Sequence, residues 1–210
     1  MEDALRGFAR IARSVRSNVV GVGAHLAPRE NVSTPRWRGM KPKVLLTGRP
    51  GSGKTTLIKR VVGKLSLPAG GFYTQEIREG GQRVGFKIVT LTGEEAVLAH
   101  VDLKTEKRVG KYGVDLRGLE SIGVAAVRRA VAARQLVIID EIGPMEIRSS
   151  IFCDAVTEAL DSNAPMLGTI SVRPFPFTNR IKKRYDVAVI EVRATNREQL
   201  AVQLSKQFGA

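Results

Sequence analysis

The stretch KVLLTGRPGSGKTTLIKRV, residues 43–61, decides the fold. Its first five residues are an apolar run typical of a buried strand, and from Lys54 apolar residues recur at the spacing of an amphipathic helix. The segment between them fits the pattern G-x-x-x-x-G-K-[ST] of a phosphate-binding P-loop. Its residues are Gly48, Arg49, Pro50, Gly51, Ser52, Gly53, Lys54 and Thr55.

The residue types of this loop suit the binding of a nucleoside triphosphate. Glycines let successive backbone N–H groups point at phosphate oxygens, and the N-terminus of the following helix adds a partial positive charge. Lys54 can reach the β- and γ-phosphates, the hydroxyl of Thr55 can ligate Mg²⁺, and Thr56 can donate to the α-phosphate. We therefore predict that residues 48–56 bind the nucleotide.

A second motif, LVIID at residues 136–140, is followed directly by Glu141. A continuous apolar run that ends in a carboxylate is expected at the centre of a parallel sheet. In P-loop proteins such an acid holds Mg²⁺, so we predict that Asp140 and Thr55 are the metal ligands. A carboxylate at the next position can deprotonate a water in line with the γ-phosphate, and we predict that Glu141 is this catalytic base.

The rest of the chain alternates between strand and helix patterns, which predicts a three-layer α/β fold with a mostly parallel central sheet. The turn residues at 79–82 add a β-hairpin insertion. The expected strands are 43–47, 71–78, 83–91, 136–140, 165–171 and 186–192, and the expected helices are 54–65, 119–134, 150–161 and 196–208.

Residues 1–42 differ in character from the domain predicted at 43–210. They carry eight Lys or Arg against three acidic residues, a net charge of +5. Residues 1–20 have the pattern of a basic amphipathic helix, and residues 21–42 resemble a linker. This arm is either an anchor to nucleic acid or an anionic surface, a targeting segment, a helix docked on its own domain, or a dispensable extension.

The composition of the 210 residues narrows the class of protein. A net charge of +14 favours polyanionic partners such as nucleotides or nucleic acid. A single cysteine, Cys153, excludes an intrachain disulfide and fits a cytoplasmic location. Two histidines, far apart, argue against a metal site built from His, and no apolar stretch is long enough for a membrane span.

Beyond these motifs, the chain resembles the small nucleoside-triphosphatases of archaea and thermophilic bacteria and their animal relative, the cancer-related nucleoside-triphosphatase. The stretches that carry the resemblance are LLTGRPGSGKTTLIKRV (45–61), GFYTQEIREGGQRVGFKIVTL (71–91), VGKYGVDL (109–116), VIIDEIGPMEI (137–147), LGTI (167–170) and IKKRYDVAVIEVRATNREQL (181–200). They cover nearly the whole domain.

The resemblance implies an enzyme that hydrolyses nucleoside triphosphates to the diphosphate and phosphate, with Mg²⁺ and loose base selectivity. It also implies a catalytic arginine at Arg184, with Arg173 as a weaker rival. Three departures from the family pattern are Gln75, Pro144 and a lid-like loop at 172–179 that is shorter than expected.

Two other functions remain open at this stage. A nucleotide, nucleoside or RNA kinase would use the same residues with a different acceptor. A nucleic-acid-associated protein would use its triphosphate site as a switch, and the basic arm is the motive for that alternative. Glu146, which follows the acid pair, is a candidate brace for the Mg²⁺ site, and Cys153 has the setting of a packed thiol.

Overall fold

The computed structural model describes residues 41–209, and within them a nine-stranded sheet is the central feature. The predictions made for residues 1–40 lie outside this range. The strand order is β5-β6-β4-β3-β2-β7-β8-β1-β9. The strands are β1 (Lys43–Thr47), β2 (Ala69–Glu79), β3 (Gln82–Thr90), β4 (Glu95–His100), β5 (Arg108–Val109), β6 (Tyr112–Val114), β7 (Leu136–Ile142), β8 (Met166–Ile170) and β9 (Val187–Glu191).

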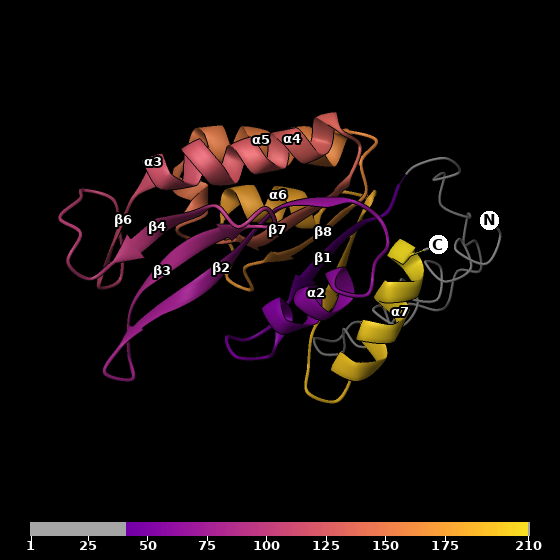
Figure 1. Ribbon diagram of the computed structural model, residues 1–210, viewed down its shortest axis with the longest axis horizontal. Coiled ribbons are helices and arrows are strands. Elements are labelled where there is room, and N and C mark those ends of the chain that lie inside the picture. The colour runs from indigo at the N-terminus through magenta and orange to yellow at the C-terminus, as the bar shows by residue number, and fades with distance from the viewer. Residues whose placement is uncertain (1–40, 210) are drawn as a thin grey trace, which may run out of the picture.

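Helices cover both faces of this sheet, which confirms the three-layer α/β fold (Figure 1). They are α2 (Lys54–Val62), α3 (Leu116–Gly118), the π-helical η1 (Leu119–Val124), α4 (Ala125–Ala132), the 3₁₀ segment η2 (Glu146–Arg148), α5 (Ser150–Asp161), α6 (Pro176–Lys182) and α7 (Arg197–Gly209). Alternate residues of β1 point to opposite faces, so Leu45 packs under α4 and α5 whereas Val44 and Leu46 pack against α2 and α7.

The parallel half of the sheet consists of β2, β7, β8, β1 and β9. All five strands run in the same direction, so one edge of the sheet gathers the P-loop after β1, Asp140 and Glu141 in β7, and the loops that follow β8 and β9. Ligands of open α/β sheets bind at this carboxyl edge. The first strand, β1, lies between the last two, β8 and β9.

The other half of the sheet is antiparallel and larger than one hairpin. The β2–β3 hairpin turns at Gly80 and Gly81, as predicted, and both have positive φ. The strands β4, β5 and β6 then extend the same sheet, and the sequence did not predict them. Beyond the pairing of Tyr73 with Asp140, β2 leaves β7 and continues to Glu79 with β3, so the hairpin projects past the carboxyl edge (Figure 1).

The described helices are all too short or too polar to cross a membrane.

Candidate active site

The P-loop curls tightly because its glycines adopt conformations that other residues avoid. Gly48, Gly51 and Gly53 have φ values of 142°, 78° and 88°. At Gly48 even a Cβ would clash, since it would lie 2.8 Å from the carbonyl oxygen of Val192. The Nζ of Lys54 donates to the carbonyl oxygens of Gly48, at 3.0 Å, and Arg49, at 3.3 Å. Lys54 is therefore held inside the loop, at the place where phosphate oxygens would replace these acceptors.

Asp140 is buried at the carboxyl edge, with 2% of its surface exposed. Thr169 of β8 donates its hydroxyl to Oδ1 at 2.5 Å, and Thr74 donates to the backbone carbonyl at 2.7 Å. Burial raises the pKa of Asp140, while the hydrogen bond from Thr169, the nearby Thr55 hydroxyl and the charge of Lys54 oppose this shift. The Thr55 side chain is close enough to Asp140 to lower the pKa of its carboxyl group, so the two predicted metal ligands lie together.

Glu141 lies where the pairing of β7 and β8 shifts register, between Ile139 and Ile142. Such irregularities redirect side chains and are common beside active sites. Burial and the neighbouring charge of Asp140 raise the pKa of Glu141, and Lys54 opposes the shift. A raised pKa suits a general base, because the carboxylate is then more ready to accept a proton.

The residues at this edge fit Mg²⁺. The Oδ2 atom of Asp140 is buried and has no hydrogen-bond partner among the described residues, and the Thr55 hydroxyl is close to the same carboxylate. Carboxylate and hydroxyl oxygens are ligands of the kind Mg²⁺ takes, and it typically keeps waters and substrate phosphates as further ligands. No group of three or more His, Cys, Asp or Glu side chains in residues 41–209 forms a metal cage of its own, so phosphate oxygens would complete the shell.

Glu146 is a third buried carboxyl beside the acid pair, at the start of η2 and 4% exposed. Burial, and then the charges of Glu141 and Asp140, raise its pKa to about 8, against the hydrogen bonds from the N–H groups of Glu146 and Gly143. No ion pair is found for it within residues 41–209. A pKa near 8 favours the protonated form of Glu146 at pH 7, and in that form it adds no charge beside Asp140 and Glu141.

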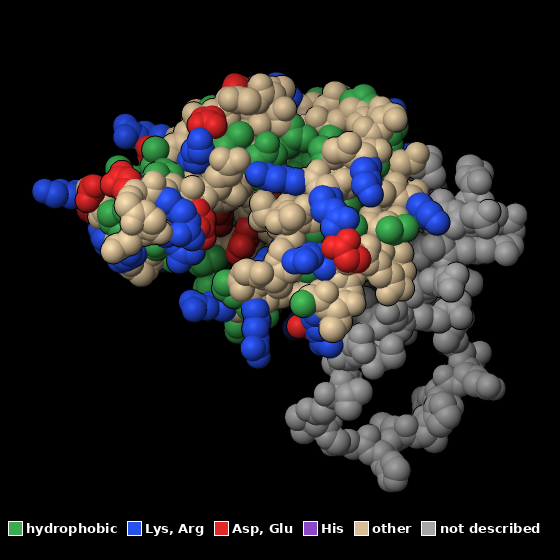
Figure 2. Space-filling model, turned by 60° about the horizontal axis from the view of Figure 1, so that its bottom comes forward, with side chains coloured by type: hydrophobic (Ala, Val, Ile, Leu, Met, Phe, Trp, Pro, Cys, Tyr) green, Lys and Arg blue, Asp and Glu red, His purple; other side chains and the backbone are tan. Residues whose placement is uncertain are grey.

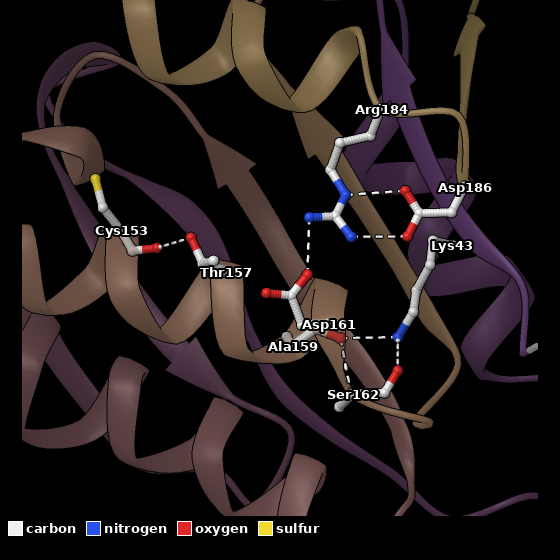
Figure 3. Close-up of polar contacts among 8 residues, drawn as sticks. All are labelled: Lys43, Cys153, Thr157, Ala159, Asp161, Ser162, Arg184 and Asp186. Carbon is white, nitrogen blue, oxygen red and sulfur yellow. Dashed lines mark hydrogen bonds and ion pairs between the residues drawn. The ribbon is translucent and has the colours of Figure 1, made fainter.

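Arg184 does not belong to this site, contrary to the prediction of a catalytic arginine. Its guanidinium forms a bidentate pair with Asp186, at 2.9 and 2.7 Å, and an ion pair with Asp161 at 2.8 Å (Figure 3). Arg184 precedes β9, whose first residue, Val187, pairs with the first residue of β1, Lys43. Arg184 therefore lies at the amino edge of the sheet, at the opposite end of β1 from the P-loop.

This amino-edge cluster is structural. Lys43, 2% exposed, donates to the carbonyl oxygens of Ala159 at 2.7 Å and Ser162 at 3.0 Å, and to that of Ala164 (Figure 3). These carbonyls lie at and just beyond the end of α5, where helices leave acceptors unsatisfied. The rival, Arg173, follows β8 and is exposed at the carboxyl edge, on the same side as the acids.

The sequence pointed to the acid pair but missed two residues that hold it, Thr169 and Thr74. Thr169 lies in the LGTI stretch, and a polar residue near the end of an apolar strand was the available signal.

Cys153 is half-buried rather than fully packed, and burial raises the pKa of its thiol. Figure 2 shows acidic side chains recessed in a hollow of the face turned to the viewer, with Lys and Arg side chains around it.

Comparison with known proteins agrees with this architecture. The family model described as NTPase matches residues 43–205. Nucleoside-triphosphatase THEP1 of Thermotoga sp. (strain RQ2) is 51% identical over 158 residues, which are 75% of this chain and 90% of the relative. The cancer-related nucleoside-triphosphatase of Homo sapiens is 41% identical over 177 residues, covering 77% of this chain and 93% of the relative.

Two solved structures are also similar. The crystal structure of THEP1 from Aquifex aeolicus has a TM-score of 0.72 at 34% identity, and covers 77% of this chain and 96% of that one. The solution structure of a human cancer-related nucleoside triphosphatase has a TM-score of 0.69 at 38% identity, and covers 79% of this chain and 96% of that one. Because the family model spans the P-loop, the acid pair and the strands between them, this chain belongs to the NTPase family.

Proposed function

We propose that this protein hydrolyses nucleoside triphosphates to the diphosphate and phosphate, with Mg²⁺ and with loose base selectivity. The relatives named above are nucleoside-triphosphatases, which supports the activity. The observation that carries the proposal is the meeting of four side chains at one edge of the sheet: Lys54 and Thr55 after β1, and Asp140 and Glu141 in β7.

Lys54 and the loop amides would bind the phosphates. Lys54 exchanges two carbonyl acceptors for phosphate oxygens, and it lies close enough to affect both Asp140 and Glu141. Thr55 and Asp140 would hold Mg²⁺, which offsets the negative charge of the phosphates when it is bound. Phosphoryl transfer requires mainly positioning and electrostatic stabilisation, so this arrangement suits it.

Glu141 supplies the proton acceptor. The oxygen of a water attacks the γ-phosphorus, the bond from that phosphorus to the oxygen bridging to the β-phosphate breaks, and the proton of the water passes to Glu141. The products are the nucleoside diphosphate and phosphate. In this scheme Asp140 acts as a carboxylate; the hydrogen bond from Thr169 to Oδ1 and the charge of Lys54 favour that ionised form, against the burial that raises its pKa.

The test compares two variants by phosphate release and by equilibrium nucleotide binding. Glu141→Gln keeps the shape of the side chain but removes the base, so kcat should fall by roughly 10²–10⁴ while Mg²⁺ and nucleotide still bind. Lys54→Ala should abolish turnover and also weaken binding, because the γ-phosphate loses its cation. Loss of binding in Glu141→Gln, or normal turnover in Lys54→Ala, would contradict these roles.

The acceptor and the base are tested with the unmodified protein. ATP, GTP, CTP and UTP should be hydrolysed with similar kcat/KM. Free phosphate should form from labelled ATP at the same rate with and without added nucleosides, nucleotides or RNA. Transfer of the label to one of these additives would make the protein a kinase and overturn the assignment of water as the acceptor.

A further inference from the structure

The segment between β9 and α7, residues 192–196, lies directly against the P-loop. Val192 donates its N–H to the carbonyl of Thr47 at 2.8 Å, and its own carbonyl is the atom that a Cβ on Gly48 would meet. Asn196 fixes the shape of the segment, since its side chain accepts from the Arg193 N–H at 2.8 Å and donates to the Glu191 carbonyl at 2.9 Å. The segment is therefore preformed beside the loop that would hold the phosphates.

The side chain of Arg197 passes over Gly53, the last glycine before Lys54. A Cβ on Gly53 would lie 2.9 Å from Nη1, 3.0 Å from Cδ and 3.7 Å from Cζ of Arg197. Glu198, 3.8 Å from Nε of Arg197, also bonds Arg60 of α2 at 2.7 Å and so ties α7 to α2. The side chain of Arg197 is 40% exposed, so one part is packed on the P-loop and another part faces solvent.

The order of the strands gives the direction of a bound nucleotide. Along the carboxyl edge the strands run β7-β8-β1-β9, with the acids on β7, the P-loop after β1 and Arg197 after β9. The γ-phosphate must face Glu141, on the β7 side. The nucleoside end of the same molecule then leaves the P-loop on the β9 side, where Arg197 lies.

We propose that Arg197 forms a nucleoside subsite: its guanidinium contacts the base and ribose of the triphosphate without reading the identity of the base. This inference rests on the proposed function, because it takes the position of the γ-phosphate from the role of Glu141. A guanidinium plane stacks on any nucleobase, since every base offers a π-face. Contact of this kind would let one site take purine and pyrimidine triphosphates alike, as the proposed loose base selectivity requires.

The experiment measures dissociation constants in a Glu141→Gln background, where no turnover is needed. The ligands are ATP, GTP, CTP, UTP and inorganic tripolyphosphate, which has the phosphates but no nucleoside. Adding Arg197→Ala should weaken all four nucleotides by about 10-fold, which is about 1.4 kcal/mol. It should change the binding of tripolyphosphate by less than about twofold. Equal loss for tripolyphosphate would place Arg197 on the phosphates, and no loss for any ligand would remove it from the site; either result overturns the proposal.

Two further variants exclude indirect effects. Arg197→Lys keeps the charge and an alkyl stem over Gly53 but lacks the planar group, and it should weaken the nucleotides as much as Arg197→Ala. Recovery of full affinity in Arg197→Lys would contradict a stacking role. Arg128→Ala, which removes a comparably exposed arginine of α4 from its pair with Glu158, should leave all five constants unchanged. If the unmodified protein releases no phosphate, the proposed hydrolysis fails, but these binding ratios still decide the role of Arg197.

Discussion

Replacement of Glu146 by Gln should change how the stability of the nucleotide-free, metal-free protein depends on pH. The folded state raises the pKa of Glu146 from 4.5 to about 8, so the folded protein holds this proton more tightly than the unfolded chain does. The stabilisation from that proton is present at low pH and is lost as pH rises through about 8. Glutamine has nearly the same shape and never ionises, so the Glu146→Gln protein has no such loss over this range.

The size of the effect follows from the shift. Each pKa unit corresponds to about 1.4 kcal/mol, and the unfolded chain is already ionised at pH 6. Between pH 6 and 8.5 the wild-type protein should therefore lose about 3 kcal/mol of stability relative to Glu146→Gln. For a chain of this length, about 3 kcal/mol corresponds to a difference in Tm of about 6–12 °C.

The assay is urea unfolding of both proteins with EDTA at pH 6 and pH 8.5. Glu106→Gln, an exposed carboxylate between β4 and β5, serves as the matched control and should run parallel to wild type. The reasoning is refuted if wild type and Glu146→Gln change by the same amount between the two pH values. That result would mean that Glu146 is already ionised at pH 6, despite its burial and its acidic neighbours.

The remaining predictions concern the amino edge and the N-terminal arm. Arg184→Ala should lower the free energy of unfolding by about 3 kcal/mol, because it leaves Asp186, 5% exposed, without its cation, and it should change kcat by less than about twofold. Thermal melting and phosphate release measure these two effects. A 100-fold loss of kcat would show that Arg184 is catalytic after all. A chain that starts at Met40 should fold and hydrolyse triphosphates at close to the full rate, because every site residue named here follows Lys43. The same truncation should weaken salt-dependent retention on heparin or anionic liposomes, and a drop in Tm of 10 °C or more would instead show that the arm is packed on the domain.

The sequence predicted the parts of the site that are local in the chain. A strand, a loop and a helix within residues 43–61 need only short-range signals, and an apolar strand that ends in two acids is equally direct. Two elements have no such signal in the sequence: the π-helical start of the 119–134 helix and the two-residue strand β5. Both depend on packing against residues far away in the chain.

The error at Arg184 has a single structural origin. The assignment of Arg184 depends on the family resemblance of the stretch IKKRYD, which says nothing of where the structure of this chain places it. The helix α6 begins at Pro176 and carries the chain from the carboxyl edge back to the amino edge. Because of this short helix, which the sequence did not predict, Arg184 lies at the amino edge of the sheet and not beside the P-loop. No property of Arg184 itself indicated this position.

The position of β1 between β8 and β9 has a consequence for the order of folding. The strand that precedes the P-loop is synthesised first, but its two neighbours are separated from it by about 120 and 140 residues of chain. Contacts of such long range close large loops before they stabilise anything, which makes them slow to form. On the ribosome, both edges of β1 therefore stay unpaired until β8 has emerged, and one edge stays unpaired until β9 follows. A chain that stops before Val187 keeps the complete P-loop sequence but lacks one of the two strands that hold β1 in place.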